Sequence, residues 1–329
     1  MMKPGFEEEI GLIKKVIVDF WDGHRSNLAV VSDPFRGETE LMDEVEGMIG
    51  EEGARINARS LFRDLKALNE APGRIVVVEE AHRLYQRKVG GFEAIDRFLN
   101  MLLASDRLFI TTWNSVSWKY LDEVIGLSRH FPQKIRISRM SAGEIRKMIL
   151  SGYEEKELTF LEVELDEEEL KIFNRASRQK TLAGHSFEIP YPAISSRSIR
   201  SRMDRTEKKS AEEIFFDRLA SISDGNPGVA ELLWKEALDY PEVRNVLKDP
   251  PSIDLHRDES FALCIVLSMG SVEMEYLSEV LEPLGISALN ISNLLEEMGL
   301  VTIDGEVISV RALALKSIFE HLRRARLVW

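Results

Sequence analysis

The chain has 329 residues, of which 44% are hydrophobic and 30% charged, and its net charge is −13. This length predicts two or three domains, and no apolar run approaches the roughly 18–20 residues of a membrane-spanning helix. The acidic N-terminus does not fit a secretory signal, so a cytoplasmic location is expected. The negative charge argues against non-specific binding to nucleic acid, which depends on a positive surface.

Helical and strand-like patterns alternate over the first 140 residues. They predict, in order, a helix over 6–21, a strand over 28–32, a helix over 38–50, a strand over 74–80, a helix over 92–104, a strand over 107–114, a helix over 117–127 and a strand over 134–138. This alternation predicts a doubly wound α/β domain with a parallel sheet. Ligands of such sheets bind where the strands end, and polar residues follow three of the predicted strands, at 32–39, 79–80 and 111–114.

The segment after the first strand has nearly the spacing of a phosphate-binding loop, G-x-x-x-x-G-K-[ST], between a strand and a helix. Ser32 takes the place of the first Gly, Gly37 matches the second, and Thr39 matches the Ser/Thr. Glu38 stands where the Lys is expected, and a carboxylate there repels the phosphates that the Lys should hold. Arg36 is a candidate to supply the cation from another direction. The alternative is an ordinary strand-to-helix turn.

The region from 141 to 250 predicts a helical unit with an insertion at about 153–210. Ser141 and Glu144 have the spacing of a capping box, and helices are predicted over 142–151, 211–222 and 226–239. Within the insertion, residues 154–169 hold nine acids against one Lys, and residues 171–209 hold ten Lys or Arg against three acids. We interpret the second block as a flexible insertion. It either binds nucleic acid, an anionic membrane or an acidic partner, or only balances the acidic block.

Residues 251–329 predict a winged helix, because three helices near 258–268, 273–282 and 287–298 precede a hairpin over 300–310 and a last helix over 311–326. Asp304-Gly305 is the predicted turn of the hairpin. The third helix has no Lys or Arg and two adjacent acids, Glu296 and Glu297. Reading DNA requires cations around that helix, so a protein contact is favoured, with DNA binding as the alternative.

Four short segments, taken in order, resemble motifs of the AAA+/STAND superfamily of P-loop NTPases, especially archaeal ATPases and Orc/Cdc6-like proteins. They are the loop at 32–39, a Walker B-like run at 76–84, a sensor 1-like strand at 109–114 and a Gly-Asn-Pro element at 223–228. The resemblance spans roughly residues 25–329. It implies a P-loop-type parallel sheet followed by a helical lid and a winged helix.

The resemblance also implies site residues. Glu79 and Thr39 would hold Mg²⁺, and Glu80 would polarise the attacking water. Asn114 or Thr112 would be the sensor. Arg129, in a Ser-Arg pair, would be an arginine finger acting on a neighbouring subunit. Three of the motifs depart from the family pattern: the loop lacks its Lys, the first Walker B acid is Glu, and the sensor 2 Arg is absent. Glu79 and Glu80 have a second interpretation, as strand-end acids paired with Arg83, Arg87 or Lys88.

Three hypotheses follow. The first is a catalytically degenerate AAA+/STAND-like protein that acts as an interaction or regulatory module, with ATPase activity weak or absent and with a protein partner or a second copy. The second is an active Orc/Cdc6-like ATPase that uses ATP and Mg²⁺ to bind or remodel DNA complexes. The third is a membrane-peripheral scaffold that uses the basic insertion. The residues alone leave open whether ATP or ADP binds at all.

Overall fold

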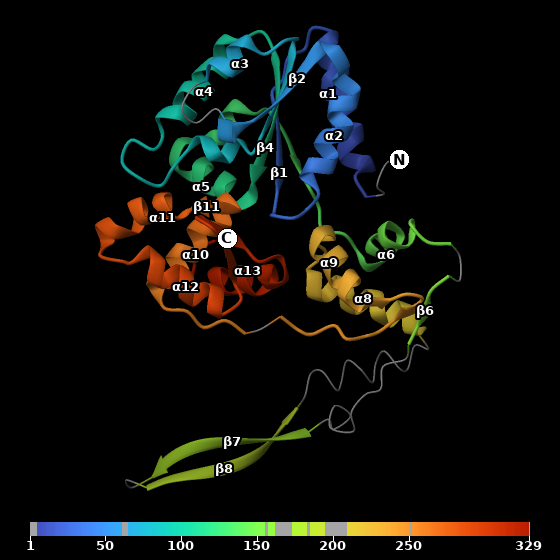
Figure 1. Cartoon of the computed structure of the whole chain (residues 1–329), viewed down its shortest axis with the longest axis vertical. Helices are drawn as coiled ribbons and strands as arrows, with labels where there is room; N and C mark the ends of the chain where they lie inside the picture. Colours follow the sequence, from blue (N-terminus) through green and yellow to red (C-terminus); the bar gives the residue numbers. More distant parts are fainter. Residues whose placement is uncertain are drawn as a thin grey trace.

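A computed structural model describes residues 5–60, 65–154, 157–161, 173–182, 185–194, 209–250 and 252–328, with the backbone alone described for 173–182 and 185–194. An α/β domain lies above two smaller units in Figure 1, one built around the C-terminal helices and one around the lid helices. Within these described residues, no helix is both long and apolar enough to cross a membrane. The predicted insertion lies in large part outside them.

The α/β domain is built on a five-stranded parallel sheet with the order β2-β3-β4-β1-β5, which confirms the predicted fold class. The strands are β1 (Leu28–Ser32), β2 (Gly53–Asn57), β3 (Ile75–Glu79), β4 (Leu108–Asn114) and β5 (Gln133–Arg136). The helices are α1 (Glu7–Trp21), α2 (Glu38–Ile49), α3 (Lys66–Glu70), α4 (Glu93–Ala104) and α5 (Ser115–Ile125). Helices α1 and α2 cover one face of the sheet, and α3, α4 and α5 cover the other (Figure 1).

The register of the sheet brings the predicted strand-end residues to one edge. Ser32 at the end of β1 lies beside Asn114 at the end of β4, and Asn57 at the end of β2 lies beside Glu79 at the end of β3. The strands behind this edge are buried because both faces are covered, which explains their continuous apolar runs. Polar side chains at 32, 79 and 114 therefore converge at the carboxyl edge of the sheet.

Strand β2 was not predicted from the sequence. Its segment reads Gly-Ala-Arg-Ile-Asn, which lacks the β-branched run of the central strands, because β2 is an edge strand and its side chains are only partly buried. Its middle residue, Arg55, becomes important at the site described below.

The lid unit consists of α6 (Ala142–Leu150), α8 (Ala211–Ser223) and α9 (Pro227–Ala237). The predicted capping box of Ser141 and Glu144 is present at the start of α6. Short strands β6 (Thr159–Phe160), β9 (Leu238–Asp239) and β10 (Glu242–Val243) form a small sheet beside these helices. Strands β7 (Phe173–Leu182) and β8 (His185–Ile194) pair as an antiparallel hairpin within the segment for which no strand was predicted.

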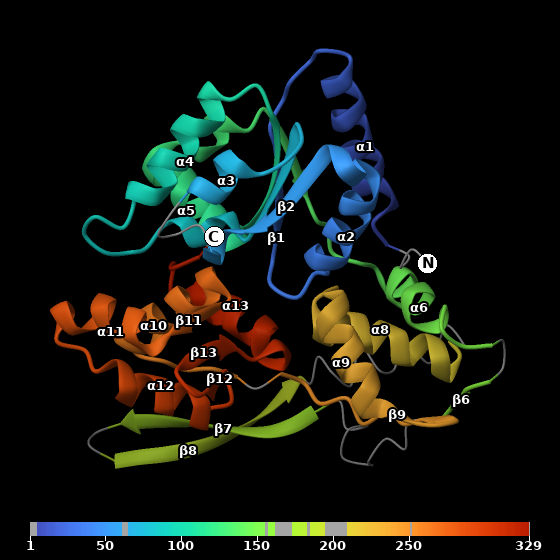
Figure 2. The ribbon, with the colours of Figure 1, turned by 45° about the horizontal axis from the view of Figure 1, so that its top comes forward.

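The C-terminal unit contains the predicted helices and hairpin. Its elements are α10 (Arg257–Met269), β11 (Ser271–Glu273), α11 (Met274–Leu281), α12 (Ala288–Glu297), β12 (Val301–Asp304), β13 (Val307–Val310) and α13 (Leu315–Arg324). The hairpin turns at residues 305–306, next to the predicted position, and the unpredicted strand β11 completes an antiparallel sheet of order β11-β13-β12. Figure 2 shows this unit lying below the carboxyl edge of the parallel sheet.

Candidate functional site at the carboxyl edge of the sheet

The loop between β1 and α2 has a compact shape that depends on two left-handed residues, Phe35 with φ 66° and Gly37 with φ 78°. The Arg36 side chain between them is buried. Its guanidinium donates to the Ser138 carbonyl at 2.7 Å and to Asp33 at 3.0 Å. Arg36 thus ties the loop to the segment after β5.

Glu38 is the first residue of α2 and accepts a hydrogen bond from the Ser32 hydroxyl. Burial, and then the nearby charges of Glu80 and Glu79, raise the pKa of Glu38 to about 8. The carboxyl group is therefore largely protonated at neutral pH, because burial and two nearby carboxylates disfavour its charged form. The place of the expected phosphate-binding Lys is filled by a neutral acid bonded within the loop.

The first Walker B-like acid, Glu79, is held by Arg55 of β2. The Arg55 guanidinium donates to both Glu79 carboxylate oxygens, at 2.8 and 2.9 Å, and also reaches Asp43 and Glu46 of α2 at 2.6 and 2.9 Å. A bidentate pair of this kind is among the stronger hydrogen-bonded ion pairs in proteins. The carboxylate predicted to bind Mg²⁺ is thus already bound on both oxygens by a cation, which it shares with two acids of α2.

The second acid, Glu80, adopts a left-handed conformation with φ 53°, and its backbone N–H donates to the Thr112 hydroxyl at 2.9 Å. Its carboxylate lies 2.9 Å from the Arg59 Nε and 3.1 Å from the Arg83 Nε. Burial alone would raise the pKa of Glu80, but Arg83 and Arg59 outweigh it and lower the pKa to about 2. Glu80 is therefore a fixed anion at neutral pH, and a weak base.

Asn114, the predicted sensor, uses its side chain within the protein. Its Oδ1 accepts from the Val116 N–H at 2.8 Å and caps α5, and its Nδ2 donates to the Leu267 carbonyl of α10 at 2.9 Å. Its backbone N–H donates to the buried His82 at 3.1 Å. Burial, and then Arg83, lower the pKa of His82 to about 3, so this imidazole is neutral.

The C-terminal unit packs directly onto this edge. Arg83 donates to the Ser271 carbonyl at 3.1 Å and to its hydroxyl at 2.9 Å, and the Ser117 hydroxyl donates to the Ser268 carbonyl at 2.6 Å. The two side chains that bind Glu80, Arg59 and Arg83, therefore also bind Ser271, the first residue of β11. The predicted catalytic edge is at the same time an interface between the two units.

The lid closes on the loop from the other side through the Gly-Asn-Pro element at the start of α9. The Asn226 side-chain amide donates to the Pro34 carbonyl at 2.7 Å, and the Gly228 N–H donates to the Phe35 carbonyl at 3.1 Å. A Cβ at position 228 would lie 2.5 Å from that same carbonyl oxygen, so only Gly allows this approach. The element that resembled sensor 2 therefore holds the loop by two hydrogen bonds to loop carbonyls.

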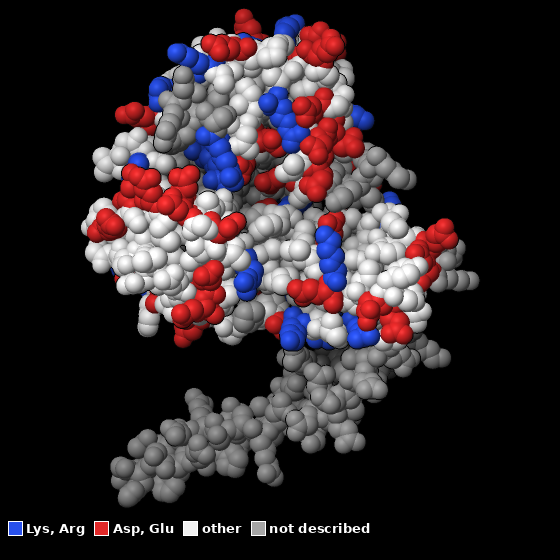
Figure 3. All heavy atoms as spheres, viewed as in Figure 1, with Lys and Arg blue, Asp and Glu red and all other residues white. Residues whose placement is uncertain are grey.

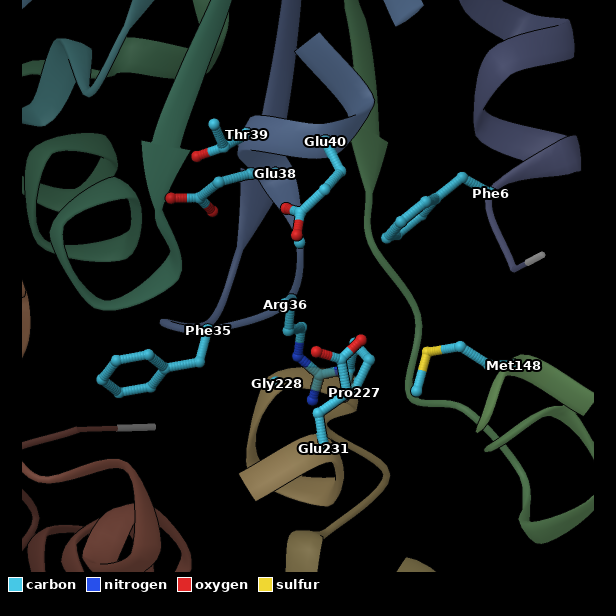
Figure 4. Close-up of a pocket in the computed structure, with 11 residues that line it drawn as sticks. Phe6, Phe35, Arg36, Glu38, Thr39, Glu40, Met148, Pro227, Gly228 and Glu231 are labelled. Carbon is cyan, nitrogen blue, oxygen red and sulfur yellow. The ribbon is translucent and has the colours of Figure 1, made fainter. Parts of the chain in front are cut away.

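A cavity of about 320 Å³ opens between the loop and the lid. Figure 4 shows Phe6 and Met148 on one side of it and Pro227 and Gly228 below, with the Glu38 carboxyl pointing away from Arg36. A Cβ on Gly37 would lie 2.9 Å from the Phe6 ring, so the ring closely covers the end of the loop. The cavity is thus shaped by the loop, α1 and the lid together.

The sequence-predicted site residues divide into three groups. Ser32, Glu38, Glu79 and Glu80 converge at the carboxyl edge, and Asn114 ends the neighbouring strand there. Gly37, Thr39 and Arg36 line the loop cavity. Arg129 is exposed just before β5, whose first residue pairs with the start of β1, so it lies at the opposite edge of the sheet. Arg129 is therefore not close to the acids at the carboxyl edge of the same chain.

Two important residues were missed from the sequence, Arg55 and Arg59, although the pairing of Glu80 with Arg83 was predicted. Both missed cations lie on or next to the unpredicted strand β2. Two Arg residues separated by four positions opposite two strand-end acids would have been a usable signal once that strand was placed.

The residues present do not fit a nucleoside triphosphate with Mg²⁺. A neutral acid replaces the cation that should hold the outer phosphates, and Arg55 donates to both oxygens of the carboxylate that should hold the metal. Among the described residues, no group of three or more His, Cys, Asp or Glu is arranged to hold a metal ion.

The parallel sheet and the loop between β1 and α2 define the class of fold: this is an α/β protein with a doubly wound parallel sheet. No protein-family model matches the chain, and no curated protein matches it.

Solved structures do match the chain. A RuvB variant from Thermotoga maritima is 14% identical with a TM-score of 0.45, and the match covers 98% of this chain and 95% of that chain. The T. maritima RuvB Holliday junction branch migration motor is 13% identical with a TM-score of 0.43, covering 98% of both chains. Aeropyrum pernix Orc1 in complex with DNA is 13% identical with a TM-score of 0.38, covering 99% of this chain and 94% of that chain. At these identities the similarity is one of fold alone.

Proposed function

We propose that the chain is a catalytically degenerate AAA+-like protein that acts as an interaction or regulatory module, with nucleotide binding weak or absent. Glu38 carries this proposal. A working loop needs a cation against the outer phosphates, and here a protonated carboxyl group stands in that place, bonded to Ser32. The loss of one charge-assisted contact weakens binding by about 1.5–3 kcal/mol, before any repulsion from Glu79 and Glu80 is added.

The other candidate catalytic side chains support the same function. Glu79 is paired with Arg55, and Glu80 is paired with Arg59 and Arg83. Asn114 caps α5 and donates a hydrogen bond to α10. A catalytic group must be able to reach the reacting atoms, whereas these groups are used to hold the protein together.

We propose three domains, at 1–140, 141–250 and 251–329, with the carboxyl edge as their common contact. Arg83 and Asn114 hold the C-terminal domain, and the Phe35 carbonyl holds the lid. A partner that displaces one of these domains would change the contacts of the others, which is how an interface can act as a regulatory element.

We propose that the C-terminal domain is a winged helix whose partner is a protein. Helix α12 and the residue after it expose Leu289 at 57%, Leu294 at 37% and Met298 at 37%, beside Glu296 and Glu297. On the face drawn in Figure 3, Lys and Arg side chains form small separate groups among Asp and Glu. An apolar and acidic helix suits a protein surface better than a phosphate backbone.

The test is a steady-state ATP hydrolysis assay of the full chain and of Glu80→Gln. We expect no turnover above background in either protein, since no nucleotide is held at the loop. A steady rate in the native chain that Glu80→Gln abolishes would establish the second hypothesis, an active ATPase, in its place.

A further inference from the structure

An acidic surface surrounds helix α12 on the C-terminal unit. Residues 273–306 contain eight Asp or Glu and no Lys, Arg or His. Glu279 pairs with Lys88 at 2.5 Å, and the Glu296 carboxylate accepts a hydrogen bond from the Ile303 N–H at 2.9 Å. Within the described part of the chain, five further exposed acids form no ion pair: Glu275, Glu282, Glu297, Asp304 and Glu306. The surface therefore holds negative charge that ion pairs among the described residues do not neutralise.

Helix α12 also exposes apolar side chains on this surface. The 3.6-residue period places Leu294 and Met298, four positions apart, along one side of its outer face and Leu289 along the other. Glu297 lies between these two rows, and Leu284, just before the helix, is 60% exposed. Figure 1 shows α12 on the side of the C-terminal unit that faces away from the α/β domain. Exposed apolar side chains together with acids suit a contact with a basic and apolar protein surface.

The hairpin of β7 and β8 has such a face. Directly paired residues lie on the same face of a hairpin, and the faces alternate along each strand. The register places cationic and apolar residues together on one face: Ala176, Arg178, Lys180, Leu182, His185, Phe187, Ile189 and Tyr191. The one acid of the two strands, Glu188, is at a position on the other face. One face of the hairpin is therefore basic and apolar, with no acid.

The hairpin needs a partner that covers this face. Strands β7 and β8 form a sheet of two strands only, and an isolated hairpin is at best marginally stable in water unless another element packs on its apolar face. Pro190 and Pro192 lack the N–H donors that a further strand beside β8 would need, so the partner is expected on the face and not at that edge. In Figure 1 the hairpin projects away from the units of its own chain.

We propose that the hairpin face with Arg178 and Lys180 docks on the α12 surface of a second copy of this chain. The cations of the hairpin then meet acids that have no ion pair, and the apolar residues of both surfaces leave water. The contact joins two different surfaces, so repeated contacts either close a ring or extend a chain of copies. This inference rests on the proposed protein-binding role of α12. A chain that stays monomeric would remove this inference alone, because the hydrolysis assay tests the loss of ATPase activity separately.

The experiment is analytical ultracentrifugation of the full chain, in which we expect self-association that grows with concentration. Two charge-reversed variants, Glu282→Lys/Glu297→Lys and Arg178→Glu/Lys180→Glu, should each associate about 100-fold more weakly, because each lost charge-assisted contact costs about tenfold. An equimolar mixture of the two variants should associate again, since the Lys residues of one copy then meet the Glu residues of the other. The matched control, Glu51→Lys/Glu52→Lys, reverses two exposed acids outside the α12 surface and should associate like the native chain.

Three results would overturn the proposal. The first is a native chain that stays monomeric up to about 200 μM, since a specific contact between copies should be populated there. The second is a mixture of the two variants that fails to associate, which would mean that the two surfaces do not meet between copies. The third is hairpin variants that associate like the native chain but lose saturable binding to an oligo-dT strand of about 20 nucleotides, which would assign the hairpin to nucleic acid instead.

Discussion

Arg55 and Glu79 form a bidentate ion pair, with hydrogen bonds of 2.8 and 2.9 Å between neighbouring strands of the sheet. Their side chains are only 15% and 17% exposed, so water screens the pair weakly. The carboxylate that a metal would need is therefore already bound to Arg55. This pair also fixes a cation from β2 at the carboxyl edge of the sheet.

Arg55→Met should destabilise the fold by about 3 kcal/mol, because it leaves the half-buried Glu79 carboxylate without its cation. Arg55→Lys is the matched control. It keeps the charge but loses the bidentate geometry, so the decrease in stability should be smaller. Urea unfolding monitored by circular dichroism measures both. Equal stability of Arg55→Met and the native chain would mean that the pair is only a surface contact.

The raised pKa of Glu38 predicts a pH dependence of stability. The folded chain holds this proton up to about pH 8, whereas the unfolded chain releases it near 4.5. The stabilising contribution is therefore complete below pH 4.5 and is lost as the pH rises through 8, by an amount on the order of a few kcal/mol. Glu38→Gln should show a flatter stability curve between these pH values, measured by urea unfolding at each pH. Superimposable slopes in the two proteins would contradict the protonated state.

Asn114 should act through structure. Asn114→Ala removes the α5 cap and the hydrogen bond to the Leu267 carbonyl, which then keeps only its longer bond from the Gly270 N–H at 3.4 Å, with an expected cost of about 2–3 kcal/mol. Asn114→Ser keeps a capping oxygen but cannot donate to Leu267, so the difference between the variants separates the cap from the contact between domains. Thermal unfolding measures both. If Asn114→Ala unfolds like the native chain, neither hydrogen bond contributes to stability.

Gly228 should not tolerate a side chain. Gly228→Ala places a Cβ 2.5 Å from the Phe35 carbonyl oxygen and should cost about 1–3 kcal/mol by separating α9 from the loop. Gly143→Ala is the control, since its exposed position in α6 has no close neighbour and should gain about 0.5–1 kcal/mol. Hydrogen exchange of the loop amides would report the opening directly. Unchanged exchange in Gly228→Ala would show that the contact between α9 and the loop does not protect the loop.

Much of the fold could be predicted from the sequence because its strands are buried on both faces. The segments 75–78 and 28–31 are wholly apolar, which is typical of a central parallel strand covered on both faces. Edge strand β2 and strand β11 were missed because their side chains are only partly apolar and their pairing depends on neighbours distant in sequence.

The candidate site could be located but not interpreted from the sequence. Strand ends at Ser32, Glu79 and Asn114 were placed correctly because parallel strands end at one edge. Their partners could not be predicted, since Arg55 reaches Glu79 from the neighbouring strand and Leu267 reaches Asn114 from α10, far away in the sequence. Spacing reveals a residue's own element, whereas its hydrogen bonds depend on tertiary packing.

The most direct measurement is a calorimetric titration of the native chain with ATP and Mg²⁺, repeated with Glu38→Lys. Our account predicts no saturable binding by the native chain up to about 1 mM nucleotide, and measurable binding once a Lys replaces the protonated acid. Saturable, micromolar binding of ATP by the native chain would contradict it, because another cation would then be holding the outer phosphates.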